Sequence, residues 1–280
     1  MQIRTPANDG SRPLRMFVYG APRRWKSSFA GTFPKPIFLS PSQEGGDRTL
    51  AAYPDAQVIS IDTMKDMQDA VSMIERDHRR YGWRTVVVDS ITFYNDLVLA
   101  ELTKGKTSGQ IMNVKDWGVL ELHVMKWLLP TLHRLPLHVI WIALENVVKG
   151  DDDQVLRIEP MIPGKMAQKL PASTDLIVYA DQMLLKPPVV EVSGTSVVMR
   201  TQPYGKVMAG GRFWDAFPEG YVLPYFESIK AAIGPWIGEG GTVEVQPVAQ
   251  EEEAQVARNG PAVKPRVVAA QTAKPVQVRK

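Results

Sequence analysis

The chain has 280 residues, 44% of them hydrophobic, and a formal net charge of +3. This length and composition allow a substantial buried core, and we expect one folded domain followed by a tail. The absence of cysteine excludes disulfides, thiolate catalysis and cysteine zinc sites, and the four histidines show no metal-binding pair at helical spacing. No apolar run approaches the ~20 residues of a membrane span and the N-terminus lacks a signal-peptide pattern, so we expect a cytoplasmic protein without membrane contact.

The first predicted strand covers residues 14–19 and follows a polar, flexible lead-in of residues 1–13. A helix is predicted from Lys26 to Thr32, because the prolines that follow cannot continue it. The loop between strand and helix, with the first helical residues, consists of Gly20, Ala21, Pro22, Arg23, Arg24, Trp25, Lys26, Ser27 and Ser28.

A strand, a loop that begins at glycine and a Lys-Ser pair that opens a helix form the layout of a phosphate-binding P-loop. In such a loop the backbone N–H groups and the helix N-terminus hold a polyphosphate. The lysine, here Lys26, reaches the terminal phosphates, and the hydroxyl, here Ser27, binds Mg²⁺. We therefore predict that residues 20–28 bind a nucleotide; the alternative is an ordinary strand, turn and helix.

Trp25 stands where a P-loop normally has glycine. Its side chain restricts a backbone that must come close to the phosphate, so we expect nucleotide binding rather than fast hydrolysis. Arg23 and Arg24 add positive charge that can offset a poorer loop, or they are simply solvated loop residues.

Two acids follow the next predicted strands. Residues 36–40 form a buried strand, and the turn-rich loop after it places Glu44 at the carboxyl edge of the sheet, where ligands bind in open α/β folds. A strand over 57–61 and an amphipathic helix over 64–80 come next. The β-branched strand 84–90 ends at Asp89, which either holds Mg²⁺ through water, as in P-loop proteins, or starts a turn or caps the next helix.

The following segment is predicted to be helical over 92–102, then a polar loop, then a helix over 116–135 that is interrupted at Pro130. The loop lysines Lys104, Lys106 and Lys115 either face DNA phosphates or are solvated. A fifth strand covers 137–148. Glu145 near its end either approaches the terminal phosphate and the attacking water or is an edge carboxylate that keeps the strand soluble.

Beyond Gly150 we predict antiparallel structure. The expected elements are a hairpin tip at 151–153, strands at 155–158, 175–179, 182–186 and 196–201, and helices at 163–170 and 224–233. Lys206 and Arg212 lie in a Gly-rich loop that either reaches a neighbouring subunit's nucleotide or is structural. Residues 237–280 are poor in aromatic residues, and we predict a disordered tail.

Together these segments resemble the RecA-like P-loop ATPases, most closely the compact bacteriophage group that acts in single-strand annealing and recombination. The resemblance covers approximately residues 14–233 and rests on 19–22 with Lys26 and Ser27, 39–46, 86–92, 116–118 and 139–145. It implies an α/β fold: a RecA-like P-loop NTPase core over 14–236, with a mostly parallel central sheet flanked by helices and an antiparallel C-terminal extension.

The resemblance also implies roles for single residues. Lys26 would bind the β- and γ-phosphates of ATP, Ser27 would bind Mg²⁺, and Asp89 would hold the metal's water shell. Glu44 would orient or deprotonate the attacking water, and Glu145 would sense the γ-phosphate. In that family a lysine and an arginine of the late loop lie closer together than Lys206 and Arg212 do here.

The function implied is that of an ATP-binding protein of phage origin, acting in the infected bacterial host, that forms a homo-oligomer and binds single-stranded DNA in recombination or replication. The sequence itself shows no stripe of aromatic and basic residues, so the DNA partner depends on the resemblance. The alternative is a P-loop fold that has lost catalysis and serves as a scaffold or interaction protein. A small-molecule kinase would need an acceptor pocket and a lid, and neither is identified in the sequence.

Overall fold

A computed structural model of the protein describes residues 12–43, 45–104, 114–186, 189, 194–238 and 240. The chain divides into the units Met1–Thr242 and Val243–Lys280, and every described residue belongs to the first. Glu44, Lys106, nearly all of the lead-in and nearly all of the predicted tail lie outside the described residues. Among the helices that the structure describes, none has the length and apolar character to span a bilayer.

The strands are β1 Arg15–Gly20, β2 Pro36–Pro41, β3 Gln57–Ile61, β4 Thr85–Asp89, β5 His138–Lys149, β6 Val155–Pro160, β7 Leu176–Leu185, β8 Gly194–Arg200, β9 Gly210–Gly211 and β10 Tyr221–Val222. The α-helices are α1 Lys26–Gly31, α2 Met64–Tyr81, α3 Ile91–Thr103, α4 Val114–Leu122, α5 Leu129–Arg134, α6 Met166–Ala172 and α7 Phe226–Ile233. Short 3₁₀ segments cover Gly46–Ala52, Trp214–Ala216 and Gly234–Trp236, and a π-helical turn covers His123–Leu128.

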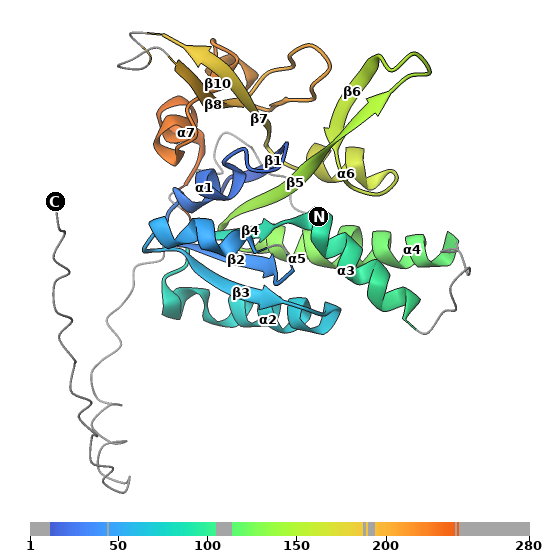
Figure 1. Ribbon diagram of the computed structural model, residues 1–280. Helices are drawn as coiled ribbons and strands as arrows, with labels where there is room; N and C mark the ends of the chain where they lie inside the picture. The colour runs from blue at the N-terminus through green and yellow to red at the C-terminus, as the bar shows by residue number, and fades with distance from the viewer. Residues whose placement is uncertain are drawn as a thin grey trace, which may run out of the picture. The chain divides into compact units, whose positions relative to one another are not determined.

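The strands form one sheet in the order β10-β8-β7-β1-β5-β4-β2-β3, with β6 paired to β5 and β9 to β7 (Figure 1). Six of them, from β7 to β3, run parallel, whereas β8, β10 and β6 pair antiparallel with their neighbours. The expected mixed α/β fold with a mostly parallel sheet and antiparallel C-terminal strands is confirmed. Because β1, β2, β4 and β5 are parallel, their carboxyl ends meet at one edge, where the predicted site residues lie.

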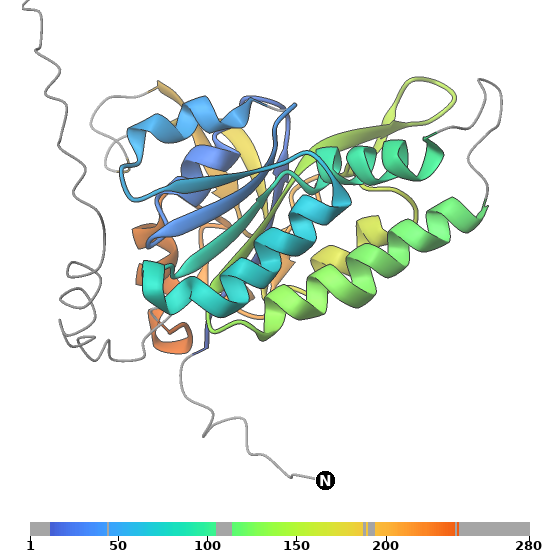
Figure 2. The same ribbon diagram turned by 90° about the horizontal axis from the view of Figure 1, so that it is seen from below.

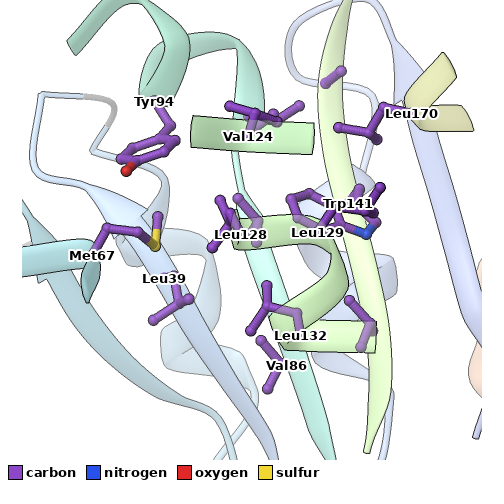
Figure 3. Packing of buried hydrophobic residues seen from close by; sticks show 14 of the residues in the cluster. Leu39, Met67, Val86, Tyr94, Val124, Leu128, Leu129, Leu132, Trp141 and Leu170 are labelled. Carbon is purple, nitrogen blue, oxygen red and sulfur yellow. The ribbon is translucent and has the colours of Figure 1, made fainter. Parts of the chain in front are cut away.

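The side chains of the central strands alternate between two cores, one on each face of the sheet. Tyr19, Leu39, Val86 and Trp141 pack on the face covered by α2, α3, α5 and α6, and Figure 3 shows Leu39, Val86 and Trp141 converging on leucines of the π-helical turn and α5. Their neighbours in sequence, such as Val18, pack on the opposite face with α1 and α7. The helices therefore enclose both faces (Figures 1 and 2) and leave the sheet's carboxyl edge for a ligand.

The irregularity that we predicted at Pro130 lies one turn earlier in the helix. The helix widens to π geometry over His123–Leu128, where the Leu129 N–H bonds the Val124 carbonyl, and α helix resumes through Pro130. A proline cannot donate to the carbonyl four residues before it and its ring crowds that carbonyl, so the preceding turn opens while the helix continues.

The prediction of separate strands at 175–179 and 182–186 was wrong, because β7 runs unbroken through Asp181. The Asp181 carboxylate accepts a hydrogen bond of 2.9 Å from Arg200 Nε on β8, so this acid makes a cross-strand ion pair rather than a turn. The first half of β7 also pairs parallel with β1, in a region predicted to be antiparallel throughout. The first half of β7 thus extends the parallel core.

Two histidines near the start of β5 are held in their neutral form. His138 is fully buried, its Nδ1 accepts a hydrogen bond of 2.9 Å from the Leu14 N–H, and burial together with the Arg84 charge lowers its pKa to about 4. His133 Nε2 accepts from Trp141 Nε1 at 3.1 Å, and burial, assisted by Arg15 and Arg212, lowers the pKa of His133 to about 4. In each ring the accepting nitrogen must be unprotonated, so the geometry and the direction of the shift agree.

Candidate nucleotide-binding site

The predicted P-loop leaves β1 at Gly20, where the chain passes very close to β7. A Cβ at Gly20 would lie 2.9 Å from the Ala180 carbonyl oxygen, and its φ of 154° is rarely adopted by other residues. Arg23 and Trp25 have φ values of 60° and 56° and are left-handed, although neither is glycine. A left-handed conformation costs a residue with a side chain roughly 1–2 kcal/mol, so this loop keeps two bulky side chains at positions where glycine would be unstrained.

Lys26 opens α1 beneath the loop and is only 7% exposed. Its ammonium donates to the Gly20 carbonyl at 3.0 Å and to the Ala21 carbonyl at 2.7 Å. These bonds curl the loop around the lysine head, with the N-terminus of the helix facing the same space. This is the arrangement that the Lys-Ser spacing predicts.

Asp89, at the end of β4, meets the P-loop although β5 lies between β1 and β4. Its carboxylate is 3% exposed and accepts a hydrogen bond from the Ser27 hydroxyl. Burial raises the pKa of Asp89, and the Ser27 hydrogen bond and the Lys26 charge oppose that rise without cancelling it. The helix cap that was the alternative role for Asp89 belongs to Ser90, whose hydroxyl accepts from the Phe93 N–H.

A cavity of about 610 Å³ opens over this cluster. It is lined by Pro22, Arg23, Arg24, Trp25, Lys26, Ser27, Ser28, Gly45, Thr49, Asp89, Phe93 and Leu144. The sequence prediction included the loop residues and Asp89 but missed Gly45, Thr49, Phe93 and Leu144. Thr49 and Gly45 come from the connection after β2, whose position at the carboxyl edge was the available signal, whereas nothing in the local pattern marked Phe93 or Leu144.

The charge in this cavity is predominantly positive. Arg23, Arg24 and Lys26 line it together with a single carboxyl group, that of Asp89. Neither Arg23 nor Arg24 forms an ion pair with a carboxylate of the described chain. A cavity with unpaired cations, a buried lysine and a helix N-terminus favours a polyanionic ligand.

Glu145 lies next to Leu144 on β5, but its side chain leaves the strand on the other face. Its carboxylate accepts a hydrogen bond of 2.8 Å from the Tyr179 hydroxyl, and Tyr179 packs on Tyr19 with ring centres 5.1 Å apart. Burial and the bond to Glu145 raise the pKa of Tyr179, and the charge of Arg24, which lines the cavity, opposes that shift. The predicted γ-phosphate role of Glu145 stays a prediction, and Glu145 does not line the cavity.

Glu44, the predicted activator of water, lies outside the described residues. Lys206 donates to the Val155 carbonyl, and Arg212 pairs with Asp175 before the amino end of β7, at the edge of the sheet away from the P-loop. Both contacts agree with the structural interpretation of that loop.

No group of three or more His, Asp or Glu side chains that could enclose a metal occurs within the described ranges. A P-loop site needs no such group, because Mg²⁺ there keeps several waters and takes its remaining ligands from phosphate oxygens and one or two protein oxygens. The adjacent hydroxyl of Ser27 and carboxylate of Asp89 are hard oxygen ligands of the kind that Mg²⁺ prefers.

The sequence profile of the AAA_24 family, described as an AAA domain, matches residues 12–213, more than half of the chain. The chain belongs to this family. It is therefore an AAA-type P-loop ATPase domain, a class that binds ATP, typically with Mg²⁺.

One solved structure similar to this AAA domain is a prototypical ATPase from the type III secretion system of pathogenic bacteria. The two chains are 14% identical with a TM-score of 0.41, and the alignment covers 79% of this chain and 62% of that chain. The AAA domain thus spans less than two thirds of that ATPase, and a likeness of this degree carries no argument about activity or partners. No curated protein sequence matches the chain.

Proposed function

We propose that this AAA domain binds MgATP in the cavity at the end of β1 and hydrolyses it slowly. The observation that carries the proposal is the hydrogen bond between Ser27 of the P-loop and Asp89 of β4, directly beside the buried Lys26. Two residues separated by more than sixty positions and by an intervening strand meet where a nucleotide's phosphates would require a hydroxyl and an acid.

Each residue then has a defined role. Lys26 exchanges its bonds to the Gly20 and Ala21 carbonyls for bonds to the terminal phosphates, and the loop N–H groups hold the remaining phosphate oxygens. Ser27 and Asp89 would hold Mg²⁺, Asp89 through water, and the metal would neutralise charge that develops on the phosphates. With three cations and one carboxyl, the cavity complements MgATP, whose net charge is about −2.

Slow turnover is supported by what the cavity offers an attacking water. Asp89 is buried against Ser27 rather than placed as a general base, so activation of the water would fall to Glu44, which lies outside the described residues. Trp25 occupies the glycine position and is 49% exposed, so its indole stands at the mouth of the cavity. A second candidate function, a nucleotide-stabilised scaffold without turnover, is favoured by the same two features.

The wider role that we propose is that of a RecA-like ATPase of the phage recombination group, which forms a homo-oligomer and acts on single-stranded DNA in the cytoplasm of the infected host. The support for this part is the resemblance in sequence, and the mildly basic charge of +3 is compatible with it. Glu44 and Glu145 keep their proposed parts in water activation and phosphate sensing.

Thermal unfolding with and without MgATP, together with phosphate release with and without single-stranded DNA, tests the proposal. MgATP at about 100 times its Kd should stabilise the wild-type protein by about 2.7 kcal/mol. Lys26→Ala should lose this stabilisation and all turnover, whereas Lys65→Ala, which removes an exposed lysine paired with Asp69 on α2, should behave as wild type.

Trp25→Gly restores the usual P-loop residue at a left-handed position and should release phosphate faster than wild type. Stabilisation by MgATP without phosphate release in either protein would favour the scaffold. A wild-type protein that MgATP does not stabilise would refute nucleotide binding altogether.

A further inference from the structure

The turn after α2 displays an aromatic pair at the edge of the sheet away from the nucleotide cavity. Gly82, with φ of 67°, ends the helix; its N–H bonds the Arg79 carbonyl, and the Trp83 N–H bonds the His78 carbonyl at 3.0 Å. This pattern is a Schellman turn, which reverses the chain immediately after Tyr81. As a result Tyr81 and Trp83 stack, with ring centres 4.6 Å apart and planes within 18° of parallel.

The pair forms a fixed platform with a partly exposed outer ring. Trp83 is 4% exposed, and its Nε1 donates to Gln57 Oε1 at 3.0 Å, which anchors the inner ring. Tyr81, supported on that ring, is 43% exposed. An exposed planar ring held by a buried one can accept another flat group by stacking at little cost in side-chain entropy.

Positive charge surrounds this platform. The Arg80 guanidinium lies over the Tyr81 ring, 5.7 Å from its centre, where it can pair with the phosphate of a stacked nucleotide, and Arg79 precedes it in the last turn of α2. Lys35 comes from the connection between α1 and β2, and a Cβ on Gly82 would lie 3.4 Å from its Nζ. The nearby acid Asp77 is already paired with Arg76 at 2.7 Å.

Arginines in a last helical turn also stabilise the helix dipole. That role does not require an exposed tyrosine stacked on an anchored tryptophan, nor a lysine contributed by another loop. A ligand that fits this surface has a flat group to stack on the Tyr81 ring and negative charges to pair with the surrounding cations. Single-stranded nucleic acid has this chemistry, because its bases are free to stack while its phosphates follow a basic track.

We propose that Tyr81, with Arg79, Arg80 and Lys35, binds single-stranded nucleic acid, with one base stacked on Tyr81. This inference rests on the single-stranded DNA partner of the proposed function and assigns it a surface. β4 joins the two sites, since it begins beside this surface at Thr85 and ends in the nucleotide cavity at Asp89. The two ligands therefore bind at opposite edges of the sheet and do not compete for one cavity.

Fluorescence anisotropy with a labelled oligothymidylate of about 20 nucleotides, titrated at several salt concentrations, tests the surface. Tyr81→Leu should weaken binding roughly fivefold to a hundredfold, the loss expected for one stacked base, whereas Tyr81→Phe should bind as wild type. The double variant Arg79→Ala, Arg80→Ala should weaken binding about tenfold or more and reduce the salt slope by about 1.4. Arg157→Ala on β6, which removes one arginine elsewhere on the surface, is the control and should change neither quantity by a comparable amount.

Stabilisation of each variant by MgATP should equal that of wild type, which shows that the fold and the nucleotide cavity are intact. The double arginine variant keeps the test decisive if Tyr81→Leu unfolds. If both the tyrosine and the arginine variants bind with wild-type affinity, the assignment of this surface is refuted, whereas the proposal of a DNA partner still stands. No binding by wild type would refute the DNA partner as well, and equal affinity for a duplex of the same length would refute stacking on Tyr81.

Discussion

Protonation of His138 should destabilise the fold as the pH falls. Its pKa is lowered to about 4 in the folded chain, against about 6.5 in an unfolded one, because the ring is fully buried and Arg84 is close. The unfolded chain therefore binds the proton more readily between these two values. The stabilising effect of the neutral ring is complete above about pH 6.5 and is lost progressively as the pH falls toward 4.

The size of the effect follows from the shift. A difference of about 2.5 pKa units contributes at most about 3 kcal/mol to the free energy of unfolding. About 2 kcal/mol of this contribution is lost between about pH 7.5 and about pH 5. His133, which is shifted in the same direction, should add to this loss.

Urea unfolding followed by tryptophan fluorescence at these two pH values measures the difference directly. His138→Asn keeps an acceptor near the Nδ1 position for the Leu14 N–H but cannot gain a proton in this range. It should reduce the pH-dependent loss by about 2 kcal/mol. His133→Gln, whose amide oxygen can accept from Trp141 Nε1, is the companion variant and should leave the His138 contribution in place. The same loss in His138→Asn as in wild type would refute the argument.

Three further variants test other parts of the structure. Asp89→Asn should leave the nucleotide-free protein at least as stable as wild type, because it replaces a buried carboxyl group whose pKa is raised. The variant should nevertheless lose the part of the stabilisation by ATP that depends on Mg²⁺. Thermal unfolding with and without EDTA measures both effects. Gly20→Ala should cost about 2 kcal/mol in urea unfolding, since its Cβ would meet the Ala180 carbonyl at 2.9 Å, and a change within error would argue against that close approach. Thr92→Val should cost about 2 kcal/mol or more, because its hydroxyl bonds both the Met161 carbonyl and the Leu144 N–H at 3.0 Å; Thr92→Ser should restore most of it.

Local pattern was sufficient to predict most of the core of the fold. The β-branched run before Asp89 is a buried parallel strand, and the apolar spacing from Met64 onward is an amphipathic helix against the sheet. Prediction failed where a tertiary contact changed a residue's usual role. Asp181 has the composition of a turn, yet its ion pair with Arg200 lets the strand continue, and Pro130 is accommodated by a π-helical turn.

The surface around Tyr81 shows the same limit. Its aromatic and basic residues, apart from Lys35, lie within the six positions from Arg79 to Arg84, but they fall across a helix end, a turn and a strand start. A stripe sought along one element does not find them. The turn at Gly82 stacks the rings, and Lys35 joins them from another loop.

The sequence by itself determined the P-loop, with Lys26 and Ser27 at the required spacing, and a strand that ends in Asp89. These features depend on neighbouring residues, through backbone preference and the period of apolar side chains. Only the tertiary structure decided that Ser27 and Asp89 touch and that Glu145 bonds Tyr179 instead of lining the cavity. Such contacts depend on the order of strands in the sheet and on the face from which each side chain leaves, and spacing along the chain encodes neither.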